Sequence, residues 1–320
     1  MKTYLGIDVG SISTDFVLIN DNKEILTSLY IRTEGNPIAA VKRGLKKVKE
    51  QINEDIEVWG VGTTGSARYL AGVITGADLV KNEITAHAKA SSFLVPDVKT
   101  IIEIGGQDSK IIILEDGVAI DFGMNAICAA GTGSFLDAQS FRLEIPIEKF
   151  GEVALKSDNP TTIASRCTIF AESDMIHKQQ VGHKTEDIVA GLCQGLARNY
   201  LAGVGKGKNI QPPIVFQGGV SENKGMIRAF EKELGEKVFV PEHNIVMGAL
   251  GVALLAREQR IDKEDEGKFR GWDVSNQDIK TSSFICDGCP NQCEVIEARI
   301  DGKVVSRWGD RCGKWSNLRA

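Results

Sequence analysis

Short apolar runs alternate along the chain with Gly-rich turns and with segments in which apolar residues recur every three or four positions. The runs Tyr4–Val9 and Phe16–Ile19 flank a turn of Gly and Ser, which predicts a β-hairpin. A second strand–turn–strand unit begins at Thr100, about 95 residues further along. Each unit opens a half with a βββαβα-like pattern, so the sequence predicts a duplicated α/β fold.

Helical periodicity marks several further segments. It predicts helices over 135–143, 169–177 and 188–201. A fourth helix, over about 244–258, is expected to pack back on the first half of the chain. A buried strand at 213–217 ends in Gly218 and then opens a helix.

The first hairpin turn offers backbone N–H groups and hydroxyls to a phosphate chain. The residues predicted to contact a nucleotide there are Gly10, Ser11, Ser13 and Thr14. Asp8 points at the same place and is expected to hold Mg²⁺ through water. A second Gly-rich turn is expected at 60–66, after a strand at 56–59. None of these turns is a Walker loop, because GxxxxGK followed by Ser or Thr does not occur.

The second strand–turn–strand unit carries candidate catalytic residues. Gln107 is expected to orient the attacking water, as Gln does in other NTPases. Asp108 is expected to share the handling of Mg²⁺ and water with Asp8; an ordinary turn residue is the alternative. The predicted site is completed by Glu103 as a catalytic residue and by Gly105, Gly106, Gly218, Gly219 and Glu222 as nucleotide contacts. Gly218 and Gly219 would let the backbone lie flat against a base or ribose.

Composition narrows the class of protein. A chain of 320 residues, 42% hydrophobic, is long enough for about two domains. The net charge of −5 and the pI near 5.6 argue against nucleic acid as the main partner. No apolar run approaches a membrane span, and the chain enters a strand at once, so we expect a cytoplasmic protein without a signal peptide. In such a protein, 7 Cys indicate metal or redox chemistry rather than disulfides.

Cys128 and Cys167 each precede a predicted helix. Two thiolates make half of a four-thiolate iron–sulfur site, and a symmetric dimer would supply the other half. The N–H groups of a helix N-terminus would stabilise such an anionic cluster. The alternative is that both are small buried hydrophobic residues, as we expect for Cys193. Gly131 and Gly133, between Cys128 and its helix, are also predicted to bind cofactor.

A charge-rich segment, 257–268, is expected to be a solvated linker to a cysteine-rich tail. The tail cysteines are Cys286, Cys289, Cys293 and Cys312, with the spacing C-x2-C-x3-C-x18-C. About 27 residues are too few to own a core, so we expect a metal to hold the tail together. Zn²⁺ and a second 4Fe–4S cluster both fit four thiolates, and reactive or unpaired thiols are the alternative.

With these motifs in this order, the chain resembles the actin-like ATPase superfamily of sugar kinases, heat-shock ATPases and acetate kinases. The segments Glu103–Asp108, Asn125–Phe135 and Ser165–Asp174 narrow the resemblance. Over about residues 3–258 the chain is similar to the activator ATPases of 2-hydroxyacyl-CoA dehydratases and to the ATPase subunits of benzoyl-CoA reductase. The tail resembles the cysteine-rich segment of longer activator relatives.

The resemblance implies a homodimer with one 4Fe–4S cluster on its two-fold axis. It further implies ATP-gated, one-electron transfer to an iron–sulfur partner, either dehydratase-like or a double-cubane-cluster reductase. A ferredoxin- or flavodoxin-type protein would be the electron donor. ATP closing a cleft between two domains would swing the cysteine-bearing helices.

The expected architecture is therefore two ribonuclease-H-like α/β domains with the nucleotide between them. The expected boundaries are 1–100 and 101–245 for the two domains, 246–269 for the returning helix and linker, and 270–320 for the metal-binding tail. The expected function is an ATP-dependent carrier of low-potential electrons. A small-molecule kinase with structural cysteines and a chaperone-like ATPase switch are the alternatives.

Overall fold

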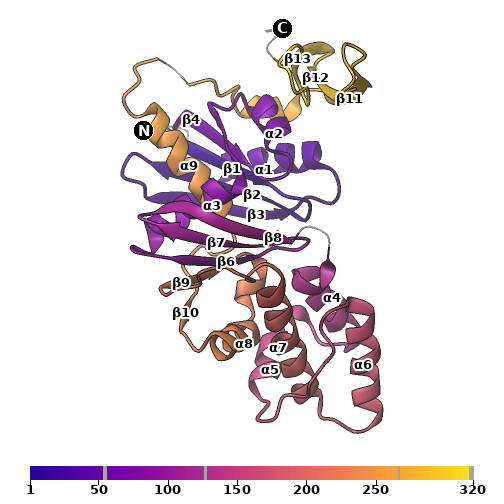
Figure 1. Ribbon diagram of the computed structural model, residues 1–320. Coiled ribbons are helices and arrows are strands. Elements are labelled where there is room, and N and C mark those ends of the chain that lie inside the picture. Colours follow the sequence, from indigo (N-terminus) through magenta and orange to yellow (C-terminus); the bar gives the residue numbers. More distant parts are fainter. Residues whose placement is uncertain (53–55, 126–127, 266, 317–320) are drawn as a thin grey trace. The chain divides into compact units, whose positions relative to one another are not determined.

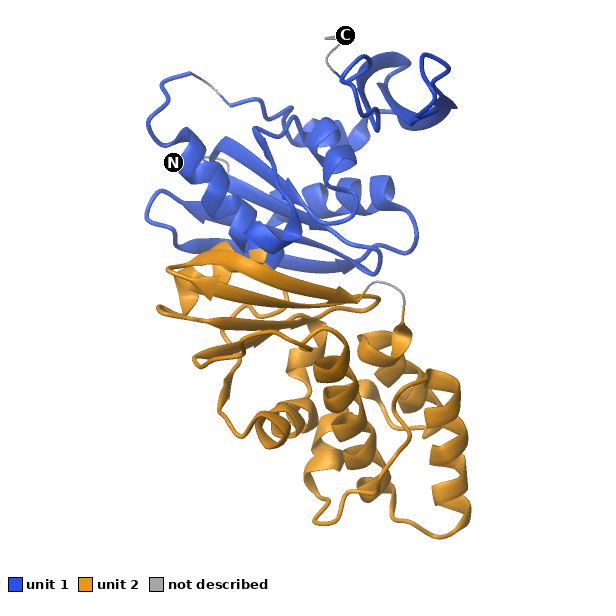
Figure 2. Ribbon diagram, in the orientation of Figure 1, with its two compact units in different colours: residues 1–86, 248–320 blue, residues 87–247 orange. Residues whose placement is uncertain are grey.

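The computed structural model describes residues 1–52, 56–125, 128–265 and 267–316. The chain forms two compact units (Figure 2): unit 1 contains residues 1–86 and 248–320, and unit 2 contains residues 87–247. The change from unit 1 to unit 2 falls inside helix α3 (Glu83–Leu94). Within the described ranges, no helix has the length and apolar composition needed to cross a bilayer.

Unit 1 is built on a five-stranded sheet with the order β3-β2-β1-β4-β5 (Figure 1). β1 is antiparallel to β2 and parallel to β4, which confirms the predicted N-terminal hairpin. The strands are β1 (Lys2–Val9), β2 (Ser13–Asn20), β3 (Ile25–Arg32), β4 (Glu57–Thr64) and β5 (Leu79–Val80). The helices α1 (Pro37–Gln51) and α2 (Arg68–Thr75) contribute Val41, Leu45 and Ile74 to the apolar core of this unit.

Unit 2 repeats this sheet, with the order β10-β9-β6-β7-β8. Read from β8 to β10, the order and strand directions match those of unit 1, so the predicted duplication of an α/β unit is confirmed. The strands are β6 (Thr100–Ile104), β7 (Ser109–Glu115), β8 (Val118–Asn125), β9 (Ile214–Gln217) and β10 (Val238–Phe239).

The helices of unit 2 are α4 (Gly133–Arg142), α5 (Ile147–Leu155), α6 (Thr168–Gln180), α7 (Thr185–Gly203) and α8 (Lys224–Leu234). Helices α5, α6 and α8 pack against α7, and α4 packs against α5. α4, α6 and α7 confirm the helices predicted from periodicity. α7 is buried along most of its length, including Cys193, because unit 2 packs its core around it.

Helix α9 (Met247–Arg260) lies directly on the sheet of unit 1. A Cβ at Gly6 of β1 would lie 1.9 Å from the carbonyl oxygen of Ala249, and one at Gly62 of β4 would lie 2.3 Å from that of Val252. The predicted Gly-rich turn at 60–66 is therefore wrong over most of its length, because residues 57–64 form β4. Those glycines admit a helix backbone, and only Gly65, with φ +88°, serves the turn.

The tail forms its own antiparallel sheet, β11-β12-β13, after a short helix η3 (Trp272–Asn276). Its strands are β11 (Ile279–Ile285), β12 (Glu294–Ile300) and β13 (Lys303–Trp308). β12 and β13 form a hairpin whose turn residues, Asp301 and Gly302, both have positive φ.

The tail packs against the rest of unit 1. Val274, Ile279 and Ile300 belong to the apolar core of unit 1, and Lys42 Nζ donates to the carbonyl of Gln277 at 2.7 Å. In the connecting segment, Arg260 is 3% exposed and pairs with Asp265 at 3.2 Å. Residues 261–265 are exposed, as expected for a solvated linker, but the expected segment starts too early, because residues 257–260 are the end of α9 and Arg260 is buried.

Candidate functional site

Asp8, near the end of β1, is enclosed by glycine backbone. A Cβ at Gly65 would lie 2.3 Å from Asp8 Oδ1, and one at Gly248 would lie 1.9 Å from Oδ2. Gly248 is in the first turn of α9. The carboxylate therefore faces a helix N-terminus, where free N–H groups stabilise negative charge.

Two residues that the sequence did not single out flank Asp8 on the sheet. Asp15 is its direct partner on β2, and Thr64 is its direct partner on β4. Asp15 is 6% exposed and Thr64 is fully buried. Burial, and then the charge of Asp8, raise the pKa of the Asp15 carboxyl well above its ordinary value.

The hairpin turn of unit 1 is tied to its own sheet. The N–H of Gly10 donates to the carbonyl of Ser13 at 2.8 Å, and the carbonyl of Gly10 accepts from the Thr33 hydroxyl at 2.8 Å. The buried Thr14 hydroxyl bonds that of Thr33 at 2.9 Å, so it is engaged within the fold. Ser11 is exposed at the tip of the turn.

The corresponding turn in unit 2 contains a buried cation that the sequence analysis passed over. Lys110 is 2% exposed, and its Nζ lies 3.1 Å from Glu103 Oε2 and 2.9 Å from Asp108 Oδ2. Both predicted carboxylates are thus held by one ammonium group. Gln107, at the tip of the same turn, is exposed to solvent.

This turn is also hydrogen-bonded to the start of α4. The N–H groups of Gly133 and Ser134 donate to the carbonyls of Gly105 and Gly106 at 2.9 Å each. The Ser134 hydroxyl donates a second bond to the Gly106 carbonyl at 2.5 Å. The predicted phosphate turn and the helix that follows Cys128 therefore share three hydrogen bonds.

The Gly218–Glu222 segment starts beside the end of β6. Gly218 has φ +87°, and a Cβ there would lie 2.5 Å from the carbonyl oxygen of Ile104. The side-chain amide of Asn244 donates to the Ser221 hydroxyl at 2.7 Å and also to Glu222 Oε1. Gly219 is exposed with open space around it, as a segment that meets a ligand requires.

Gln217, the residue before this segment, is fully engaged. Its amide nitrogen donates to Nδ1 of His87 at 2.8 Å, and its oxygen accepts from the Ser91 hydroxyl at 2.7 Å. Burial, aided by the charge of Lys110, lowers the pKa of His87 to about 3, so the imidazole is neutral.

The two cysteines predicted to bind a cluster lie on segments that cross one face of α7. A Cβ at Gly195 would lie 2.8 Å from the Cβ of Ser165, two residues before Cys167. One helical turn further, Asn199 Nδ2 is 3.8 Å from a Cβ placed at Gly131, three residues after Cys128. One turn of helix is about 5.4 Å, so α7 brings the two segments together.

The thiols themselves are open to solvent and stand at helix starts. Cys128 is exposed and precedes the short helix η1 (Ala129–Gly131), while Cys167 is half-buried and is the N-cap of α6. Cys128 is held in place by Asn125, whose side chain accepts from its N–H at 3.0 Å and donates to its carbonyl at 2.8 Å. The predicted position of both cysteines near helix N-termini is confirmed.

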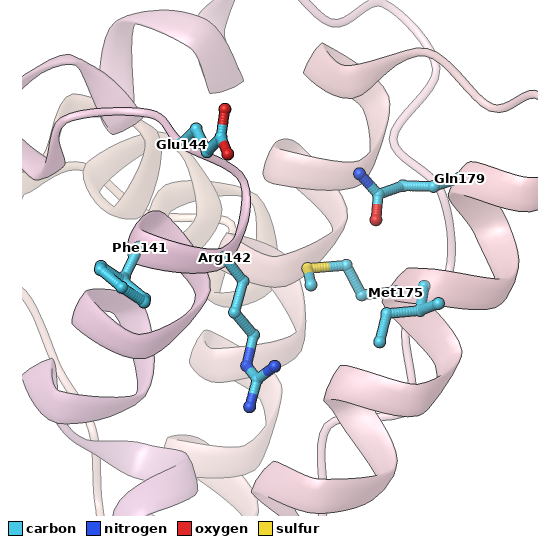
Figure 3. A pocket seen from close by; sticks show the side chains of 6 residues that line it. Phe141, Arg142, Glu144, Met175 and Gln179 are labelled. Atoms are coloured by element: carbon cyan, nitrogen blue, oxygen red, sulfur yellow. The ribbon is translucent and has the colours of Figure 1, made fainter.

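The helices that follow the two cysteines, α4 and α6, enclose a cavity of about 400 Å³ (Figure 3). Its lining consists of Phe141, Arg142, Glu144, Met175, Ile176 and Gln179. Arg142 also pairs with Glu172 of α6 at 2.9 Å. This ion pair joins α4 to α6 beside the cavity.

In the tail, Cys286 has the surroundings of a thiolate. The indole N–H of Trp315 donates to its Sγ at 3.3 Å. This bond, followed by one from the backbone N–H of Gly288, lowers the pKa of the Cys286 thiol. The N–H of Cys286 donates to the carbonyl of Cys293 at 2.9 Å, so two of the four cysteines are adjacent across the β11–β12 turn.

Among the residues that the structure describes, no three His, Cys, Asp or Glu side chains lie together as a metal site would require. The four-cysteine metal site in the tail therefore stays a prediction. The other predicted residues divide between the units: Asp8, Gly10, Ser11, Ser13 and Thr14 in unit 1, and those from Glu103 to Glu222 in unit 2.

Comparison with known proteins places the chain. Residues 5–256 match the BadF/BadG/BcrA/BcrD ATPase family. The chain belongs to this family. The match ends before the tail, so the tail lies outside the part of the chain that defines this ATPase family.

Among relatives, the chain is 34% identical to a 2-hydroxyisocaproyl-CoA dehydratase activator from Clostridioides difficile, over 82% of this chain and 98% of that one. It is 36% identical to a (R)-2-hydroxyglutaryl-CoA dehydratase activating ATPase from Acidaminococcus fermentans, over 79% of this chain and 96% of that one. The solved structure of the Clostridium difficile activator with bound ADPNP superposes with a TM-score of 0.75 at 33% identity, covering 81% and 96% of the two chains. The actin-like ATPase fold is thereby established.

Three residues of the two turns escaped the sequence analysis: Asp15, Thr64 and Lys110. For Asp15 and Lys110 a signal was present, because the segments Asp8–Asp15 and Glu103–Lys110 have the same length and end in a charged residue. Thr64 had no such signal, since only the parallel pairing of β1 with β4 places it beside Asp8.

Proposed function

We propose that this member of the ATPase family is an ATP-dependent electron carrier: a homodimer with one 4Fe–4S cluster, bound by Cys128 and Cys167 of both copies. The observation that supports it best is that one face of α7 brings the two cysteine segments together. When bound, the cluster would supply a single low-potential electron. The proposal rests on this chain's residues and on its relatives' activity as dehydratase activators.

The residues present fit such a group. Each chain offers two accessible thiols at helix starts, where N–H groups stabilise the negative charge of thiolates. Two thiols are too few for a cluster that needs four, so a second copy is required. In this arrangement Asn125 would fix the backbone of Cys128, and the α6 N-terminus would face the Cys167 sulfur.

Exposed apolar side chains beside both cysteines support a dimer. Ile169 and Phe170, two and three residues after Cys167, are 71% and 68% exposed. Phe122 and Met124, on the strand that leads to Cys128, are 52% and 45% exposed. Apolar residues concentrated in this way favour burial against another protein surface.

We propose nucleotide contacts for each unit separately. Asp8 would hold Mg²⁺ through water, and the turn of Gly10, Ser11 and Ser13 would lie against the phosphates, with the exposed Ser11 offering its hydroxyl. In unit 2, Gly105 and Gly106 would also lie against the phosphates, while Gly218, Gly219 and Glu222 would contact the adenosine.

Lys110, which the sequence did not single out, contributes to the proposed catalytic turn of unit 2. Its ammonium group holds Glu103 and Asp108 in fixed positions at the edge of the turn. Loss of one partner of such a buried pair leaves an uncompensated charge, at a cost of about 3–5 kcal/mol. The exposed Gln107 side chain at the tip would then orient the attacking water against a rigid frame.

The coupling between nucleotide and cluster would run through the Ser134 contacts. A change of the Gly105–Gly106 turn on ATP binding would shift the start of α4, because three hydrogen bonds join them. The Cys128 segment directly precedes this helix. ATP would therefore change the surroundings of the cluster, which an electron carrier needs and a small-molecule kinase does not.

For the tail we propose a four-thiolate metal site made of Cys286, Cys289, Cys293 and Cys312. The Cys286 sulfur already accepts two N–H bonds, as a metal-bound thiolate does. Zn²⁺ and a 4Fe–4S cluster remain the two alternatives. The partner we propose is an iron–sulfur enzyme, dehydratase-like or of the double-cubane type, with a ferredoxin- or flavodoxin-type donor.

Anaerobic purification tests this proposal. We expect a brown dimer containing iron and sulfide, whose ATPase activity requires Mg²⁺. Gln107→Ala should slow hydrolysis more than it weakens ATP binding, since water positioning acts in the transition state. A colourless protein that phosphorylates a small molecule would refute the proposal in favour of the kinase.

A further inference from the structure

The two turns of the duplicated fold differ in one charge. Asp8–Asp15 in unit 1 and Glu103–Lys110 in unit 2 have the same length, and each runs from the penultimate residue of one strand to its antiparallel partner on the next. In unit 2 the pair is Glu103 and Lys110, joined at 3.1 Å. In unit 1 the pair is Asp8 and Asp15, two carboxyl groups.

A buried pair of like charges is unfavourable unless something compensates it. In unit 2 the compensating cation is part of the chain, since Lys110 Nζ binds both Glu103 and Asp108. At the equivalent position of unit 1 the chain supplies a second acid. The cation that unit 2 carries covalently would have to come to unit 1 from solution.

Two buried side-chain oxygen atoms beside Asp8 could bind such a cation. Of the described residues, Asp15 and Thr64 are among the few whose buried side-chain oxygen has no hydrogen-bond partner: Asp15 Oδ1 and Thr64 Oγ1. They flank Asp8 on its two neighbouring strands, on the sheet face that α9 covers. Asp15 Oδ2 accepts from the Ser13 hydroxyl at 3.3 Å, which leaves Oδ1 available.

The residues that occupy the position of Thr64 differ between the two units. Glu103 has Gln217 as its parallel neighbour on β9, where Asp8 has Thr64 on β4. Gln217 is satisfied by Ser91 and His87. In unit 2 the equivalent residues, Lys110 and Gln217, therefore have partners for their side-chain polar groups, whereas Asp15 and Thr64 of unit 1 each have an oxygen without one.

We infer that Asp15 and Thr64 join Asp8 in a divalent-cation site within unit 1, so that the metal is held by two carboxylates and a hydroxyl rather than by Asp8 alone. Mg²⁺ suits such a set, because it takes oxygen ligands and keeps several waters. The inference deepens the proposed function, since it concerns the ion that Asp8 is proposed to hold there. It predicts that unit 1 binds the metal without nucleotide.

Mn²⁺ binding to the full-length chain, anaerobically purified and freed of nucleotide, tests the inference. The loss of the free Mn²⁺ signal in electron paramagnetic resonance measures occupancy without any need for ATPase activity. Removal of even an outer-shell partner typically costs 10–100-fold in metal affinity, so loss of a proposed ligand in Asp15→Asn or Asp8→Asn should weaken binding at least about tenfold. Thr64→Val should weaken it about two- to tenfold, as expected for one polar contact.

The sharpest variant is Asp15→Lys, which gives unit 1 the charge arrangement of unit 2. It should abolish Mn²⁺ binding while the protein stays folded by circular dichroism. Asp273→Asn, an exposed acid of the same unit, should bind Mn²⁺ like the wild type. Thermal denaturation gives a second readout: Mg²⁺ should raise the melting temperature of the wild type but not of Asp15→Asn.

The outcomes separate this inference from the proposed function. Absence of Mn²⁺ binding to the wild type would overturn it, as would wild-type affinity in Asp15→Asn and Asp15→Lys. If Asp8→Asn alone weakened binding, the role of Asp8 would stand and that of Asp15 would fall. Loss of the bridging cluster would not alter the titration, because the proposed ligands all lie in unit 1.

Discussion

The two sets of cysteines in this chain differ in how much of a metal site one copy can supply. Cys128 and Cys167 are accessible, stand at helix starts in unit 2, and give half of a four-thiolate set. The tail cysteines give four thiols in one segment of unit 1, and the Cys286 sulfur already accepts hydrogen bonds. As proposed, the first set would require a second copy, whereas the second would require only a metal.

Because of this difference, we expect the two sets of cysteines to have different functions. A site completed by a partner responds to whatever moves its helices, and the Cys128 segment is bonded to a predicted phosphate turn. A site within one small sheet responds mainly to metal supply, because metal binding and folding are coupled in such segments. The first set suits a gated electron carrier, and the second suits a structural clamp or a fixed electron relay.

Cys128→Ser should have the largest effect, because the dimer would lose two of four ligands at once. We expect complete loss of the bridging cluster and a weaker dimer, with ATP binding and tail metal retained. Iron and sulfide analysis with native mass spectrometry measures both. A variant that kept a dimer with four iron atoms at this site would contradict the assignment.

Cys286→Ser is the reciprocal variant. It should remove the tail metal and leave the bridging cluster and dimer intact. Because Val274, Ile279 and Ile300 belong to the core of unit 1, we also expect the melting temperature to fall by at least about 2 °C, equivalent to about 1 kcal/mol in a unit of this size. If this variant lost the dimer instead, the two sets would not be independent.

Ser134→Ala tests the coupling that only the first set is expected to have. It removes one of the three hydrogen bonds between the Gly106 turn and α4. The effect of ATP on cluster chelation should shrink about two- to tenfold, with little change in cluster content. Ser173→Ala, on the exposed surface of α6, is a matched control. Equal coupling in Ser134→Ala and wild type would exclude this route.

Trp315→Phe should have the smallest effect. It keeps the ring against Phe284 but removes the N–H that lowers the pKa of the Cys286 thiol. The pKa should rise, and metal affinity of the tail should fall about two- to fivefold at neutral pH, since less thiolate is available. Trp308→Phe is the control, and competition with a chromogenic chelator is the measurement. Equal affinities would leave this hydrogen bond without a role.

Features encoded by local pattern were predictable from the sequence. The hairpin β1–β2, the helices that follow Cys128 and Cys167, and the Asp301–Gly302 turn each depend on residues close in sequence. Gly62 was misassigned to a turn, because its purpose is the approach of a helix nearly 200 residues away. Arg260 was placed in a solvated linker, because its partners Trp59 and Asp78 are equally remote.

In the candidate site, too, residues in local motifs were predictable, and residues that depend on remote contacts were not. Asp8, Glu103 and Asp108 stand in recognisable turn motifs, and the cysteines have diagnostic spacing. Lys110 became important only when its buried ammonium group was found between two carboxylates. Thr64 required the strand register, since it is remote from Asp8 in sequence, and the register also shows that Asp15 lies directly opposite Asp8.

The rate of metal release to a chelator, with and without a nonhydrolysable ATP analogue, tests the central claim most directly. It is measured in Cys286→Ser, which keeps only the bridging cluster, and in Cys128→Ser, which keeps only the tail metal. We predict that the analogue changes the rate at least about fivefold for the bridging cluster and leaves the tail metal unaffected, as expected for a typical coupling between sites. Identical rates with and without the analogue at the bridging cluster would contradict nucleotide gating.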